Sequence, residues 1–112
     1  MKITNHSISQ IDLPLNLQIL NIAVNMARVS QWVFDSYDLK KELIQRFMSQ
    51  TDNYLNDLYH QNISKGFKPT LERFTKEFKD LKNLNINKEN QRCWAERALT
   101  WANILQHRAK LA

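Results

Sequence analysis

The chain is 112 residues long, which suits a single domain with a core of its own. One cysteine excludes an intrachain disulfide, and 43% hydrophobic with 24% charged residues is ordinary for a soluble globular protein. The net charge of +5 is uneven, because eleven Lys and Arg oppose five acidic residues after position 64, against five and six before it. One glycine and two prolines provide little turn chemistry for a sheet, so we expect an all-α protein.

The first twelve residues contain no apolar run of the kind found in secretion signals. We expect 1–12 to form a flexible N-terminal arm and 13–112 to form one helical-bundle domain. The most apolar stretch, 13–34, is interrupted by several polar side chains, and a bilayer-spanning helix needs about 20 mostly apolar residues. These features favour a cytoplasmic protein with no membrane span.

The segment 13–34 is predicted to form a helix with more apolar surface than a peripheral helix needs. Asp12 is a possible N-cap, and Pro14 is tolerated in a first turn. One side carries Leu13, Leu17, Leu20 and Val24, and another carries Leu15, Ile19, Ile22, Met26, Val29 and Val33. Since one stripe is enough for a peripheral helix, this helix is either central or partly buried against a partner. The predicted partner contacts are Met26, Val29, Val33 and Phe34.

Three more helices are predicted, over 37–62, 70–82 and 88–110. The residues at 35–38 form either a break after the first helix or a bend within a longer one. Thr70 and Asn87 are the expected N-caps of the last two helices. Apolar side chains in the third predicted helix step by three and four, at Leu71, Phe74, Phe78 and Leu81. Short connections between four helices predict an antiparallel bundle.

The last predicted helix has one apolar arc, formed by Trp94, Ala95, Ala98, Trp101, Ala102, Leu105 and Ala109. Large side chains at helical spacing usually pack inward, and the alanines would let a neighbouring helix approach closely. We expect Cys93 to be structural, because free cysteines are among the most buried residues.

Arg97, Trp101 and Arg108 form a line beside this arc, and three explanations compete for it. The arginine stems cover apolar surface with their heads in water, or the guanidinium groups pair with acids on a neighbouring helix or subunit. In the third explanation, the line is a possible anion-binding surface, with Trp101 stacking on the ligand.

Catalytic and metal-binding patterns are weak. No His has a Glu or a second His three or four residues away, and a single glycine cannot form a phosphate-binding loop. We therefore expect a protein that is not an enzyme and holds no metal and no cofactor.

The excess apolar surface on the first helix predicts a function in protein–protein interaction, both with a protein partner and as self-association into a homodimer or larger. The alternative is a nucleic-acid-associated regulator that uses the basic C-terminal half, although Glu72, Glu77 and Asp80 interleave with its lysines. A third class, a helical module for an amphiphilic small ligand, requires a pocket lined by Trp and Tyr.

Overall fold

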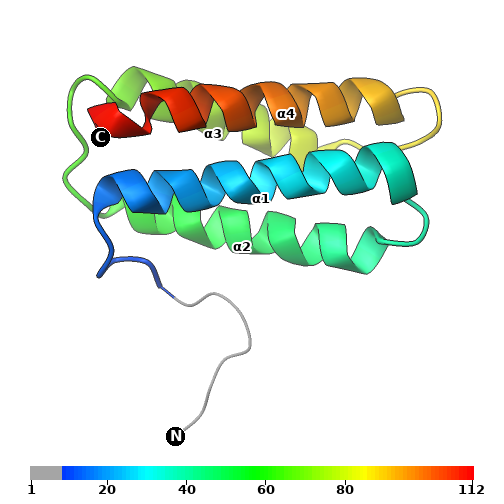
Figure 1. Ribbon diagram of the computed structural model, residues 1–112, viewed down its shortest axis with the longest axis horizontal. Helices are drawn as coiled ribbons and strands as arrows, with labels where there is room; N and C mark the ends of the chain where they lie inside the picture. The colour runs from blue at the N-terminus through cyan, green and yellow to red at the C-terminus, as the bar shows by residue number, and fades with distance from the viewer. Residues whose placement is uncertain (1–8) are drawn as a thin grey trace, which may run out of the picture.

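A computed structural model describes residues 9–112 and contains four α-helices. They are α1 (Leu15–Ser36), α2 (Lys41–Tyr59), α3 (Lys68–Asn83) and α4 (Gln91–Arg108), followed by a short 3-10 helix, η1 (Ala109–Leu111). The helices run alternately in opposite directions and are joined by short connections (Figure 1). The predicted all-α bundle of four antiparallel helices is therefore confirmed.

Helix boundaries differ from the expected ones by a few residues, and the caps differ more. The residues at 35–38 lie at a true break, because α1 ends at Ser36 and α2 begins at Lys41. The helix α3 begins at Lys68, so the expected cap at Thr70 is wrong and Pro69 lies inside the first turn. Ser64 instead stabilises the turn before α3, because its hydroxyl accepts a hydrogen bond from the Phe67 amide at 3.2 Å.

The expected N-caps at Asp12 and Asn87 also need revision. The helix α1 follows Pro14 directly and has no side-chain cap. Asn87 lies four residues before α4, where its Oδ1 accepts the amides of Glu89 and Asn90 at 2.8 and 3.0 Å. This side chain therefore orders the turn that leads into α4 and leaves the first turn of the helix itself uncapped.

Helices α1 and α4 pack closely against each other, as the alanines of α4 predict. Ala95, Ala98 and Ala102 are buried. The Ser30 hydroxyl of α1 donates a hydrogen bond to the backbone carbonyl of Ala95 at 2.6 Å. A short side chain can reach a backbone carbonyl across an interface only where the two helices approach closely, so small residues set this spacing.

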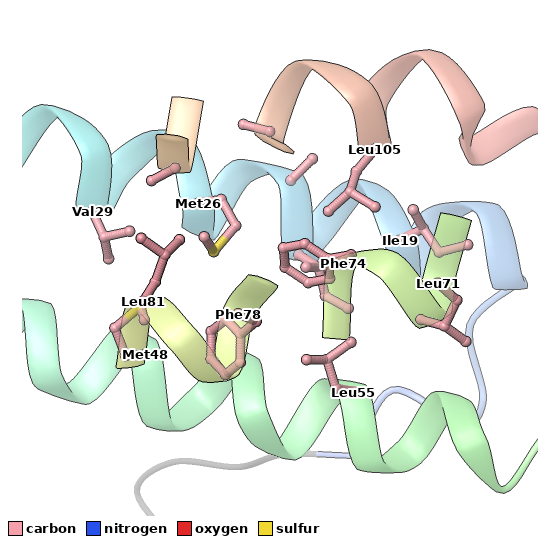
Figure 2. Packing of buried hydrophobic residues seen from close by; sticks show 14 of the residues in the cluster. Ile19, Met26, Val29, Met48, Leu55, Leu71, Phe74, Phe78, Leu81 and Leu105 are labelled. Atoms are coloured by element: carbon pink, nitrogen blue, oxygen red, sulfur yellow. The ribbon is translucent and has the colours of Figure 1, made fainter. Parts of the chain in front are cut away.

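Bulky side chains fill the rest of the core. Phe74 and Phe78 of α3 are fully buried, with ring centroids 5.8 Å apart. Figure 2 shows these rings between the ribbons of α1 and α2, near Met48 and Leu55 of α2. The interior thus pairs a close α1–α4 contact with a wider space that aromatic rings occupy.

Amide side chains join α1 to α2. Gln18 is fully buried, and its side chain forms a reciprocal pair with Gln61, with N–O distances of 3.0 and 2.8 Å. Further along α1, the Asn25 amide donates to Gln50 Oε1 at 2.9 Å and to Thr51 Oγ1 at 3.2 Å. Gln18 and Asn25, two residues of the polar arc of the first helix, are therefore satisfied by α2 and by Gln61 just beyond its end.

Most of the expected N-terminal arm, residues 1–8, lies outside the described residues. Gln10, which also falls in the expected arm, is instead buried, and its side chain accepts a hydrogen bond from the Asn21 amide at 2.6 Å. Over residues 9–112, none of the helices is long and apolar enough to cross a membrane.

Candidate functional site

The two apolar sides of α1 have different surroundings. The inner side, formed by Ile19, Ile22, Met26, Val29 and Val33, is at most 1% exposed and lies in the core. Met26, Val29 and Val33, which the sequence analysis assigned to a partner interface, therefore present no surface to a partner in this fold. Phe34 is 55% exposed, so it alone of the four predicted contacts lies at the surface.

The other side of the helix is open to solvent and is called the outer strip below. It consists of Leu13, Leu17, Leu20, Val24, Ala27, Gln31 and Phe34. Leu17 and Val24 are 42% and 45% exposed, whereas Leu20 and Ala27 are partly buried. Successive positions alternate by four and three residues, which is the heptad spacing of helices that pack against another helix.

A shallow groove extends the outer strip toward α4. Its volume is about 420 Å³. It is lined by Ala27, Ser30, Gln31, Phe34, Ala95, Glu96 and Leu99. Leu99 is 46% exposed and Phe34 stands on the opposite side of the groove, so apolar side chains flank it from both helices.

Charged residues lie near the ends of this surface, except that the exposed Glu96 of α4 lines the groove, where its carboxylate lies 3.5 Å from the Arg92 guanidinium. Asp12 and Asp35 are exposed at the two ends of the outer strip, and Arg92 and Lys110 are exposed at the two ends of the α4 segment. Because α1 and α4 are antiparallel, Arg92 is at the same end of the bundle as Asp35, and Lys110 is at the end of Asp12 (Figure 1). The α1 edge thus has an acid at each end, and the α4 edge has a base at each end, with the charge of Arg92 partly balanced by Glu96.

The line Arg97–Trp101–Arg108 is divided by the structure. The Arg97 guanidinium donates to the Glu77 carboxylate of α3 at 2.7 Å, and this hydrogen bond raises the pKa of Arg97. Trp101 packs against Phe74, with ring centroids 5.5 Å apart, and Arg108 is exposed. The ion-pair explanation thus accounts for Arg97, and Trp101 belongs to the edge of the core.

The variant Glu77→Gln is expected to lower the free energy of unfolding by about 1 kcal/mol or less, because both partners of this ion pair are partly solvated. Chemical denaturation at low and high salt measures the effect, which should shrink as salt screens the wild-type pair. Glu72→Gln, the same change at an exposed position of the same helix, is the matched control. A loss of several kcal/mol, or one that is independent of salt, would contradict the assignment of a partly exposed ion pair.

The remaining reactive and basic side chains do not assemble into a site. Cys93 is exposed, so the expectation of a buried cysteine is wrong. Among residues 9–112, no three His, Cys, Asp or Glu side chains come together as metal ligands would. Several bases of the C-terminal half have acidic neighbours, since Lys82 pairs with Asp52 as Arg97 does with Glu77. These acidic partners lower the net positive charge of the surface that a nucleic acid would contact.

The chain as a whole matches no protein-family model, and no curated protein and no solved structure is significantly similar to it.

Proposed function

We propose that this protein is a non-enzymatic helical bundle that works by binding protein, and that it binds a second copy of itself through the outer strip. One observation carries the proposal: α1 repeats on its solvent side the heptad spacing of its core side. Isolated exposed leucines need no explanation, but apolar side chains that recur with packing periodicity on the solvent side are typical of an interface; here they are Leu13, Leu17, Val24 and Phe34, which are 40–55% exposed.

The charge pattern favours one arrangement of the two copies. A two-fold axis parallel to the helices would place α1 of one copy over α4 of the other, with Asp35 at the level of Arg92 and Asp12 at the level of Lys110. An axis perpendicular to the helices would place α1 over α1, so that Asp12 would meet Asp35. We therefore favour the first arrangement, in which opposite charges face each other at both ends and the two grooves meet; Arg92 would then be shared between Glu96 of its own helix and Asp35 of the second copy.

The double variant Leu17→Glu/Val24→Glu is expected to weaken self-association by at least about 100-fold, because charged groups would replace two apolar contacts at the interface. Sedimentation velocity over a concentration series measures this loss. Leu39→Glu is the matched control, since Leu39 is 89% exposed in the turn between α1 and α2, outside the outer strip. A wild-type mass of 13.3 kDa at every concentration, or an equal loss in the control, would rule out the proposed interface.

Sedimentation velocity also tests the orientation of the two copies. Asp35→Lys should weaken the dimer, and Asp35→Lys/Arg92→Glu should restore part of the lost affinity. Recovery by the double variant supports α1 over α4. An additive loss would contradict that orientation.

A further inference from the structure

We propose that a cavity between α2 and the C-terminal end of α3 binds a small amphiphile with a carboxylate head group. The cavity has a volume of about 370 Å³, within the range of ligand pockets. Its lining combines the connection between α1 and α2, α2 itself, the last turn of α3, the connection that follows and one tryptophan of α4: Tyr37, Lys41, Ile44, Gln45, Met48, Ser49, Leu81, Lys82, Leu84, Asn85, Ile86 and Trp94. This site is separate from the outer strip and shares no residue with it.

The floor of the cavity is apolar. Ile44, Met48, Leu81 and Trp94 are all buried, and Ile86 covers part of the space from the connection between α3 and α4. The Trp94 indole N–H is already bonded to the Leu81 carbonyl at 2.9 Å, so it offers the cavity an aromatic surface and no free donor. A hydrocarbon chain suits such a floor because it removes apolar surface from water without leaving polar groups unpaired.

The charged residues of the lining are both basic. Lys41 and Lys82 line the cavity, whereas no acidic side chain does. The Lys41 ammonium lies 5.4 Å from the centroid of the Tyr37 ring at one end. Lys82 pairs with Asp52 across α2 and α3, and a ligand carboxylate would share this lysine with Asp52. Two lysines above an apolar floor therefore match an anionic head on an apolar chain.

Polar groups between the two lysines complete the rim. Gln45 and Ser49 are exposed on α2, and Asn85 faces them from the connection after α3. Amide and hydroxyl donors at this position would hydrogen-bond the oxygens of a carboxylate that the lysines attract. The rim therefore supplies both the charge and the donors that such a head group requires.

The experiment uses three probes with the same chain and different head groups: octanoate, octanol and octylammonium. They are titrated into the full-length protein and followed by two-dimensional amide NMR. Octanoate should bind about 3- to 10-fold more tightly than octanol, and octylammonium more weakly than either, because the rim carries positive charge. The shifted amides should cluster at 44–49 and 84–86. Equal affinity for the two charged probes, no binding by octanoate, or shifts centred on the outer strip would overturn the proposal.

Two variants separate the head group from the chain. Lys41→Gln/Lys82→Gln should weaken octanoate binding by about 5- to 10-fold and leave octanol binding unchanged. Lys79→Gln, an exposed position of α3 outside the cavity, is the control. Ser49→Trp places a large side chain at an exposed position of the rim and should abolish binding of every probe. Octanoate binding that survives this substitution would place the ligand elsewhere.

Discussion

Phe74→Ala is expected to lower the free energy of unfolding by about 3–5 kcal/mol, the largest effect of any single substitution considered. The Phe74 ring is fully buried, where it contacts Phe78 and Trp101, with ring centroids 5.8 and 5.5 Å away. Its removal loses the transfer free energy of the ring and leaves a cavity that neighbouring helices fill only in part. Chemical denaturation followed by circular dichroism measures the loss.

Phe34→Ala is the matched control, because it removes the same ring from an exposed position of the outer strip. We expect it to change the free energy of unfolding of the monomer by about 0.5 kcal/mol or less and to weaken self-association instead. Measurements at a concentration below the dimer dissociation constant keep the two effects apart. Similar losses for both variants would mean that Phe74 does not occupy the core as described.

Gln18→Leu is expected to cost about 2–3 kcal/mol, although leucine is the more hydrophobic side chain. The substitution removes a donor to the Leu13 carbonyl at 2.8 Å and breaks the reciprocal pair with Gln61. The Gln61 amide retains its bond to the Asp57 carbonyl at 2.9 Å, but its side-chain oxygen loses its donor. The penalty comes from polar groups left without partners in a partly buried interface.

A double-mutant cycle tests this origin. Gln18→Leu/Gln61→Leu should lower the free energy of unfolding by about 1–2 kcal/mol less than the two single variants do together, because the double variant leaves neither amide without its partner. Urea denaturation of the four proteins gives the coupling energy. Strict additivity would show that the two amides do not stabilise each other.

The fold was largely predictable because each helix carries its own periodic signal. The apolar steps of Leu71, Phe74, Phe78 and Leu81 placed α3 against the core, and all four are buried. Helix ends were less predictable. Pro69 led to a predicted start of α3 that is two residues too late, because proline is tolerated within the first turn of a helix as well as before it.

The sequence did not indicate which face of α1 lies at the surface, and three of the four expected partner contacts, Met26, Val29 and Val33, are buried in this fold. Both apolar sides have heptad spacing, and periodicity alone does not say which of them is buried. A usable signal existed: every heptad position on the inner side, from Leu15 to Val33, carries a large apolar side chain, while the outer strip contains Ala27 and Gln31. The fuller side supplies more buried area to the core, so it should have been assigned inward.

The α2–α3 cavity could not be predicted, because its walls come from segments that are distant in the sequence. In the sequence, Tyr37 and Trp94 indicate only that aromatic residues are present and do not indicate that they line one cavity. Their approach to Lys41 and Lys82 depends on how α2 and α3 are spaced, which the Phe74 and Phe78 rings help to determine. Long-range packing of this kind leaves no local pattern in the sequence.

The amide pairs between α1 and α2 have a consequence for the uniqueness of the fold. A helix with apolar seams on two nearly opposite sides could roll by about half a turn about its own axis and still bury an apolar seam, although a less bulky one. Such a roll would move Gln18 and Asn25 away from Gln61 and Thr51 and leave all four polar groups without these partners. These hydrogen bonds therefore favour one rotation of α1 about its own axis. In that rotation the outer strip stays at the surface.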